Sequence, residues 1–233
     1  MTKEDTALEL IRMALSAAKN PVVAFSGGKD STVVLHLVRK VAPSVPAQFC
    51  NTGVESPQTI EFTRTIPNLI ELHPKKKFWD IVRKHGLPKP KGGAGKGNIC
   101  CNWLKEYPAR DYDKEHGVDL IFTGITAAES NQRKIFFKWK GPYYLKREGW
   151  YKCHPIWDWS VGEVWDYIHE NNLPYNKIYD LGSDRCGCQP CTAYLADKWK
   201  RNLARENPKL LRWILKLKGQ SQLEDAECKD GGA

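Results

Sequence analysis

Residues 22–38, VVAFSGGKDSTVVLHLV, decide the fold, because an apolar run stops at a polar, glycine-rich turn and an apolar series with helical spacing follows. Residues 22–25 are continuously apolar, as in strands that are buried on both faces of parallel sheets. Consecutive backbone N–H groups at a glycine-rich turn form an anion-binding concavity, and the following helix points its positive end at it. The stretch therefore predicts a strand, a phosphate-binding turn and a helix.

The side chains of the turn suit the same ligand. Glycine lets the backbone approach a ligand closely, Lys29 adds a point charge, and the hydroxyl groups add short donors. Asp30 has two interpretations, since it either helps to hold Mg²⁺ or caps the helix. A turn that merely joins strand to helix is the alternative to phosphate binding. The residues expected to contact phosphate are Ser26, Gly27, Gly28, Lys29, Asp30, Ser31 and Thr32.

Strand-like and helix-like segments alternate along most of the chain. Further strands are expected at residues 47–50, 69–72, 120–123 and 151–153. Helices are expected near residues 4–18, 58–65, 78–84 and 104–114, and after the cap residues Ser160 and Asn207. This alternation predicts an α/β fold with an open, mostly parallel twisted sheet and helices on both faces. Residues 1–195 are expected to form the nucleotide-binding domain, and residues 196–233 a basic C-terminal helical segment with a flexible tail.

The composition is that of an ordinary soluble chain, with 233 residues, 41% hydrophobic and 27% charged. No apolar run approaches the roughly 20 residues that span a bilayer, so we expect a cytoplasmic protein without a membrane partner. The net charge of +9 favours polyanionic partners or nucleotides without choosing between them. Basic residues interleave with Trp and Leu in residues 197–219, which leaves open a solvated helix face or a nucleic-acid surface.

The segment SGGKDS after a first apolar strand resembles the PP-loop of the adenine nucleotide alpha-hydrolase superfamily. That superfamily includes ATP pyrophosphatases, tRNA-thiolating enzymes and 3′-phosphoadenylylsulfate (PAPS) reductases. NTGVESPQT at residues 51–59 and TGITAAESNQRK at residues 123–134 are similar to two further family segments, the second containing an E-S-x-x-R element. The resemblance implies a bound adenine nucleotide, which is ATP, adenylylsulfate (APS) or PAPS, with Mg²⁺. It also implies nucleotide contacts from Thr52, Gly53, Gly124, Glu129, Ser130 and Arg133.

Arg133 has two interpretations. Its guanidinium group can bind phosphate or sulfate oxygens bidentately, or it can form a surface salt bridge.

The cysteines form a second motif. The pair Cys100-Cys101 and the later Cys188-Gln189-Pro190-Cys191 resemble the [4Fe-4S] site of APS reductases and their relatives. Neighbouring cysteines converge poorly on one small zinc ion but can reach different irons of a cubane. Zinc or free buried thiols remain alternatives to the cluster. Cys186 is an extra thiol, which is interpreted as a substitute ligand or a sulfur carrier.

The reaction is the last expectation. Sulfonucleotide reductases use a tail cysteine in an E-C-G-L-H motif, and Glu227-Cys228 matches only its first two positions. The intact SGGKDS resembles ATP-splitting members instead. We therefore expect a PAPS-reductase-like ATP pyrophosphatase that activates an oxygen for sulfur insertion into nucleic acid, of the thiolation or DNA phosphorothioation type. Lys29, Asp30 and Arg133 would act on the phosphates.

In that hypothesis Cys186 or Cys228 carries persulfide from a cysteine desulfurase partner. The first alternative is an APS or PAPS reductase that uses Cys228 as nucleophile and thioredoxin as reductant. The second is a non-catalytic nucleotide-binding cluster protein within a modification complex. Relatives often dimerise, so the resemblance also implies a homodimer.

Overall fold

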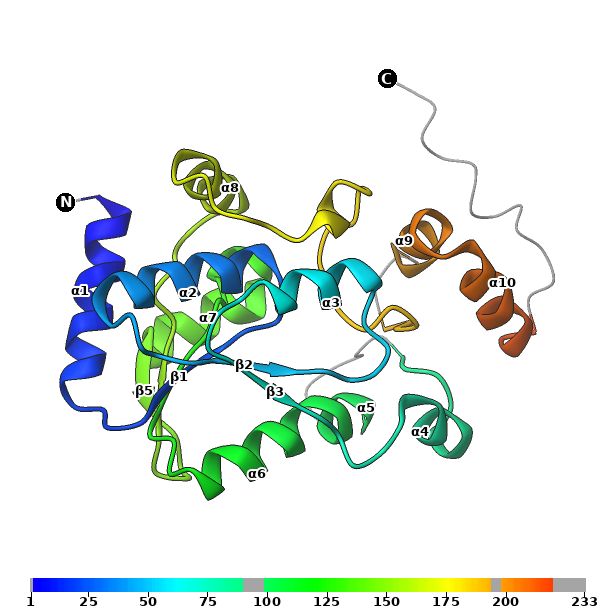
Figure 1. Ribbon diagram of the computed structural model, residues 1–233, viewed down its shortest axis with the longest axis horizontal. Coiled ribbons are helices and arrows are strands. Elements are labelled where there is room, and N and C mark those ends of the chain that lie inside the picture. The colour runs from blue at the N-terminus through cyan, green and yellow to red at the C-terminus, as the bar shows by residue number, and fades with distance from the viewer. Residues whose placement is uncertain (1, 90–98, 194–197, 220–233) are drawn as a thin grey trace.

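The computed structural model describes residues 2–89, 99–193 and 198–219, and a six-stranded sheet lies at its centre (Figure 1). The strand order is β3-β2-β1-β4-β6-β5, and every neighbouring pair is parallel except β5 with β6. The strands are β1 (Pro21–Ala24), β2 (Ala47–Cys50), β3 (Leu69–Leu72), β4 (Leu120–Phe122), β5 (Tyr143–Leu145) and β6 (Tyr151–Cys153). The predicted fold class, an α/β protein with a mostly parallel sheet, is confirmed.

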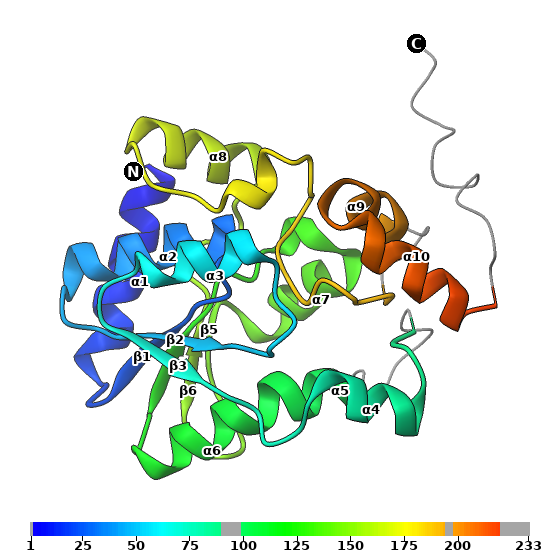
Figure 2. The same ribbon diagram turned by 45° about the vertical axis from the view of Figure 1, so that its right-hand side comes forward.

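Helices cover both faces of this sheet, with α1, α2, α3 and α8 on one face and α6 on the other (Figure 1). The α-helices are α1 (Lys3–Ser16), α2 (Lys29–Val41), α3 (Pro57–Arg64), α4 (Phe78–His85), α5 (Ile99–Cys101), α6 (Tyr107–Glu115), α7 (Asn131–Lys140), α8 (Val161–Glu170), α9 (Lys198–Glu206) and α10 (Pro208–Leu217). Figure 2 shows α9 and α10 together beyond the sheet layers, where they share a small apolar core of their own.

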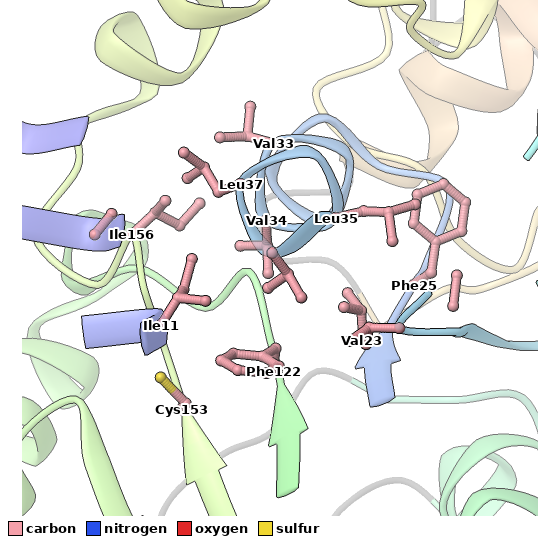
Figure 3. Packing of buried hydrophobic residues seen from close by; sticks show 14 of the residues in the cluster. Ile11, Val23, Phe25, Val33, Val34, Leu35, Leu37, Phe122, Cys153 and Ile156 are labelled. Carbon is pink, nitrogen blue, oxygen red and sulfur yellow. The ribbon is translucent and has the colours of Figure 1, made fainter. Parts of the chain in front are cut away.

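The main core lies between β1, β4 and the helices above them. Figure 3 shows side chains of α2 pointing onto Val23 of β1 and Phe122 of β4, with Ile11 of α1 closing one side. Val23, Ile11 and Phe122 are fully buried, and Cys153 of β6 joins them as a small apolar side chain. This packing fixes the start of α2 above the carboxyl end of β1, which is where the glycine-rich turn lies.

Two elements go beyond the sequence prediction. α7 follows β4, and β5 forms an antiparallel edge strand of three residues. The helix expected near residues 104–114 begins earlier, with α5, and continues through a π-helical segment (Asn102–Glu106) into α6. Ser160 and Asn207 cap α8 and α10 as expected. No helix in the described ranges is long and apolar enough to cross a membrane.

Candidate functional site

The glycine-rich turn, residues 26–32, is called the phosphate loop below and joins β1 to α2. Gly27 has φ +74°, a left-handed conformation that glycine adopts without a steric penalty. α2 begins with Gly28 as N-cap and without a side-chain cap, so its first amides remain for other partners. The hydroxyl groups of Ser31 and Thr32 donate to the Gly28 carbonyl at 2.8 and 3.0 Å. These two side chains therefore hold the loop in shape.

Lys29 and Asp30 form an ion pair at the start of α2, with 2.7 Å between Nζ and Oδ2. Lys29 is only 8% exposed, so its charge is largely shielded from bulk water. Asp30 lies in the first turn but makes no capping hydrogen bond, so one of its two expected roles is not realised. The pair places one positive and one negative group where the helix dipole is positive.

The loop after β4 packs directly on the phosphate loop. A Cβ atom added at Gly124 would lie 2.7 Å from the carbonyl carbon of Asp30, so only glycine fits there without movement. This loop continues into a short 3₁₀ turn (Ala127–Glu129) and then into α7. The contact places Gly124 directly against the phosphate loop, and nucleotide binding by Gly124 stays a prediction.

The residues of the E-S-x-x-R element are engaged with one another. Glu129 accepts a hydrogen bond from the Thr126 amide in a capping box, and Ser130 caps α7 by accepting from the Arg133 amide at 3.2 Å. The Arg133 guanidinium group forms an ion pair with Glu129. The structure thus shows the salt-bridge interpretation of Arg133, and phosphate binding by Arg133 stays a prediction.

The segment after β2 meets the C-x-x-C segment. The Thr52 hydroxyl group donates to Glu55 Oε1 at 2.8 Å and lies 3.4 Å from Cys188 Sγ. A β-bridge joins Glu55 to Cys188, and the Gln189 amide donates to the Val54 carbonyl at 2.8 Å. Gly53 has φ +75° with open space around its Cβ position. The bridge therefore holds the second cysteine pair beside the predicted nucleotide site.

The four predicted ligand cysteines are close enough to influence one another. A hydrogen bond with Cys101, then burial, then the charges of Cys101, Cys191 and Cys188 raise the pKa of Cys100. In the described residues, no three His, Cys, Asp or Glu side chains are arranged to hold a single metal ion. Four thiols from two separate segments suit a cubane, which is wider than one ion. The donor set therefore fits a [4Fe-4S] cluster, which stays a prediction.

Cys186 lies against the phosphate loop. Its Sγ donates to the Ser26 carbonyl at 3.3 Å, and a Cβ atom added at Gly28 would lie 2.9 Å from the same sulfur. Burial raises the pKa of Cys186, and the positive charge of Lys105 opposes that rise. The predicted extra thiol thus lies at the phosphate loop, and its role as substitute ligand or sulfur carrier stays a prediction. Cys228 lies outside the described residues, so its role stays a prediction.

Lys105 is a site residue that the sequence did not reveal. Its Nζ lies 4.0 Å from Oε1 of Glu55, whose side chain is 2% exposed. Burial lowers the pKa of Lys105, but the charges of Cys188, Glu55, Cys186 and Cys101 outweigh burial and raise it. A π-helical segment supplies Lys105, and such segments are frequent at functional sites. Lys105 therefore brings a positive charge close to the thiols of Cys101, Cys186 and Cys188.

Two polar residues far along the chain also hold the phosphate loop. The Tyr179 hydroxyl group accepts from the Lys29 amide at 3.0 Å, and Asn176 Nδ2 donates to the Gly27 carbonyl at 3.1 Å. Asn176 is buried and caps the 3₁₀ turn Lys177–Tyr179. The N-cap at Asn176 is the local sequence feature that could have pointed to this turn, but it does not predict that Asn176 or Tyr179 contacts the phosphate loop.

A mostly parallel sheet with an anion-binding loop after its first strand, next to a set of thiols, defines a nucleotide-binding protein of the PP-loop class. The comparison with protein families agrees with this description. The model of the phosphoadenosine phosphosulfate reductase domain matches residues 20–194. The chain belongs to this family.

Similar curated proteins come from archaea and bacteria. An uncharacterized protein of Methanocaldococcus jannaschii is 32% identical over 89% of this chain and 43% of its own length. A second one from the same organism is 31% identical over 95% of this chain and 54% of its own length. The chain thus spans about half the length of these two relatives. The adenosine 5′-phosphosulfate reductase of Bacillus cereus is 28% identical over 82% of this chain and 81% of the enzyme.

Solved structures show the same fold. The phosphoadenylyl-sulfate reductase of Candida auris aligns with a TM-score of 0.61 and 26% identity, over 78% of this chain and 88% of that one. A U34-tRNA thiolase of Methanococcus maripaludis, solved with its [4Fe-4S] cluster, aligns with a TM-score of 0.54 and 18% identity. That alignment covers 98% of this chain and 84% of the thiolase.

Proposed function

We propose that this chain is an ATP pyrophosphatase that activates an oxygen atom for sulfur insertion. The observation that carries the proposal is the shielded Lys29–Asp30 pair at the start of α2, inside an intact phosphate loop. Cleavage between the α- and β-phosphates develops negative charge on the leaving pyrophosphate. A lysine and a helix N-terminus placed there stabilise that charge in the transition state.

The carboxylate beside Lys29 serves a second purpose in this proposal. Asp30 would supply an oxygen ligand for Mg²⁺, which is usually held by one or two carboxylates together with substrate phosphates. Lys29 would then exchange its partner Asp30 for phosphate oxygens. The acceptor oxygen attacks the α-phosphorus, so an O–P bond forms, the α–β bridge bond breaks, and pyrophosphate leaves. The terminal sulfur of a cysteine persulfide then attacks the activated carbon or phosphorus of the acceptor, and AMP leaves with the oxygen. A second thiol breaks the remaining S–S bond by forming a disulfide with the carrier cysteine, and an external thiol reductant returns that disulfide to two thiols.

The thiols provide the sulfur side of the reaction. Cys100, Cys101, Cys188 and Cys191 would hold a [4Fe-4S] cluster, which when bound either carries an exchangeable sulfide or orders the site. Cys186 contacts the phosphate loop through the Ser26 carbonyl, so this thiol is positioned to bring sulfur to a nucleotide-activated group. A cysteine desulfurase is the proposed donor and a nucleic acid the proposed acceptor, in agreement with the net charge of +9. We propose a cytoplasmic location, where thiols stay reduced, and a homodimer, as the resemblance to the family implies.

The second candidate is a sulfonucleotide reductase with Cys228 as nucleophile and thioredoxin as reductant. Its support is the likeness to reductases over most of this chain, at 26% identity for the Candida auris structure. A third candidate is a nucleotide-binding cluster protein without turnover.

Anaerobic incubation with ATP, APS and PAPS separates the three. Pyrophosphate release from ATP supports the first candidate, and thiol-dependent sulfite release supports the reductase. ATP binding without turnover, in protein whose absorbance near 400 nm and iron and sulfide content indicate an intact cluster, supports the third.

Lys29→Ala is the variant that tests the phosphate loop, and we expect it to lose ATP affinity. Lys40→Ala is the matched control, because Lys40 lies at the other end of the same helix and pairs with Glu4. Equal ATP affinity in Lys29→Ala and the parent protein would refute the phosphate-binding role.

A further inference from the structure

We propose that the outer face of α7 and the adjoining hairpin β5–β6 bind single-stranded nucleic acid and guide it toward the phosphate loop. This surface is called the α7 surface, and its members are Lys134, Ile135, Phe136, Lys138, Trp139, Lys140 and Tyr144. The proposal rests on the proposed function, because sulfur insertion into nucleic acid is what would require nucleic acid near the phosphate loop. Binding of nucleic acid to the α7 surface can nevertheless be measured separately from that activity.

The first argument is the direction in which α7 turns its apolar side chains. A surface helix normally buries its apolar stripe and exposes its polar side. In α7, Phe137 is the buried apolar residue, whereas Trp139 is 80% exposed, Ile135 58% and Phe136 36%. Large rings held in water next to one another mark a binding surface rather than a packing defect.

The second argument is the pattern of charge. α7 has the sequence NQRKIFFKWK, with a cation one or two positions from each aromatic ring and no acidic residue. Between residues 131 and 152 the cations are Arg133, Lys134, Lys138, Lys140, Lys146, Arg147 and Lys152, and the one acidic residue is Glu148. Interleaved rings and cations match a chain of bases and phosphates, because rings stack on bases while lysines attract phosphates.

The third argument is that the pattern continues beyond the helix. Phe136 of α7 lies edge-on to Tyr144 of β5, with ring centroids 5.5 Å apart. Farther along, the ammonium groups of Lys146 and Lys152 lie 5.7 and 5.6 Å from the ring centroid of Trp150. The rings of α7 thus continue onto Tyr144 of β5, and the cations continue along the hairpin.

The fourth argument is the location of α7 relative to the phosphate loop, where the proposed reaction takes place. α7 starts from the loop whose Gly124 touches Asp30, and β1 and β4 are parallel neighbours that end at the same edge of the sheet. The loop that leads into α7 therefore touches the phosphate loop, and α7 itself is ten residues, about 15 Å, long. A strand lying along α7 would present one of its nucleotides to the phosphate loop.

Charge also decides against the other occupants of this face. A second copy of the chain placed on the same face would bring two sets of cations together. Lys146 and Arg147, which directly follow the edge strand β5, discourage its pairing with another strand. An acidic protein partner would satisfy the charge but gives no reason for the row of exposed rings, so we treat it as an outcome of the test.

The test is fluorescence anisotropy of a labelled, mixed-sequence 20-nucleotide RNA and its DNA equivalent, with the full chain at 50 and 200 mM salt. Trp139→Ala should weaken binding by about 5- to 100-fold, the range expected for loss of one stacked base. Met13→Ala, an exposed apolar residue on α1, is the control and should not change binding. Circular dichroism of each variant verifies that its fold is intact.

Charge reversal supplies a second, independent measurement. Lys134→Glu with Lys138→Glu should reduce the slope of log affinity against log salt by about 1.4, since each single-strand phosphate contact contributes about 0.7. Lys209→Glu with Lys216→Glu reverses two cations on α10, the competing basic helix. Binding lost in the α10 variant and retained in the α7 variant would overturn the proposal.

Two other outcomes would also overturn the proposal. Parental affinity in both α7 variants would show that nucleic acid does not use this face. A dimer that Trp139→Ala converts to monomer in sedimentation, without a change in RNA affinity, would assign the face to a second copy. Pyrophosphate release from ATP is measured in parallel with the same variants. Its absence in the parent protein counts against the proposed function alone, and loss of nucleic-acid binding alone counts against the α7 surface.

Discussion

Gly124→Ala tests how closely the loop after β4 packs on the phosphate loop. The new Cβ atom would lie 2.7 Å from the carbonyl carbon of Asp30, and 2.9 Å from both the Asp30 oxygen and the Ser31 nitrogen. All three neighbours are backbone atoms, so no change of rotamer relieves the overlap. Carbon atoms in contact are ordinarily about 3.5 Å apart, so the start of α2 must move by about 0.8 Å.

The magnitude follows from two opposing effects. Overpacking of this kind costs about 1–3 kcal/mol, and replacing glycine stabilises the protein by about 0.4–1 kcal/mol through the unfolded chain. We expect the free energy of unfolding to fall by about 1–2 kcal/mol. Because Lys29 and Asp30 move with the start of α2, ATP cleavage should fall by about 100-fold, as for a misplacement of about 1 Å in an active site.

The assay is urea unfolding followed by tryptophan fluorescence, together with pyrophosphate release. Gly162→Ala in α8 is the control, because its Cβ atom would meet only the Ser160 hydroxyl oxygen at 3.9 Å. The control should be neutral or stabilising by up to about 1 kcal/mol. If Gly124→Ala unfolds at the same urea concentration as Gly162→Ala and cleaves ATP at the parental rate, the close packing of the two loops is wrong.

Two further predictions concern stability. In Gly28→Ala the new Cβ atom would lie 2.9 Å from Cys186 Sγ, so this variant should be less stable. Adding Cys186→Ala removes the sulfur and should restore part of the lost stability. If the effects of the two substitutions on the free energy of unfolding in urea simply add, the contact is wrong. Burial, with the charges of Lys152 and Arg133, lowers the pKa of His154 to about 3. The unfolded chain binds a proton on this residue near pH 6.5, so stability should decline as the pH falls from about 6.5 toward 3, by up to about 1.4 kcal/mol per unit. In His154→Gln the free energy of unfolding should change less between pH 7 and pH 5 than in the parent protein. An equal change in both proteins would show that other groups cause the pH dependence.

The sheet was predictable where the sequence pattern is local. β2 and β3 have the predicted bounds, and β1 begins one residue earlier, at Pro21. Their short apolar runs reflect burial on both faces, which residue type alone reveals. β5 was missed because three residues, two half-buried and one exposed, carry no alternation, and their pairing with β6 is a tertiary contact. α7 was missed because it buries Phe137 and exposes the rest of its apolar side chains.

The site residues likewise fall into two groups, those that a local sequence pattern indicates and those whose role depends on tertiary contacts. The phosphate loop is a continuous stretch of chain, so its glycines and Lys29 were visible in the sequence. Lys105 was not, because its position depends on a π-helical segment that shifts the helix by one residue relative to ordinary spacing. Tyr179 was not either, since its contact with Lys29 joins residues 150 positions apart. Contacts of that kind follow from the completed fold.

Hydrogen bonds between residues far apart in the sequence connect the phosphate loop to the segment that leads into Cys188. Asn176, Tyr179 and Cys186 hold the loop through Gly27, Lys29 and Ser26, and all three precede Cys188 in one short segment. Each of these hydrogen bonds contributes about 1 kcal/mol, so a movement of the loop that leaves this segment in place costs the energy of breaking them. The Tyr179 oxygen takes the Lys29 amide, which is one of the groups that a phosphate oxygen would otherwise accept from. A nucleotide bound through this amide would have to displace the Tyr179 hydroxyl group, which lies in the segment that leads to Cys186 and Cys188. We therefore expect nucleotide binding at the phosphate loop to affect the arrangement of these thiols.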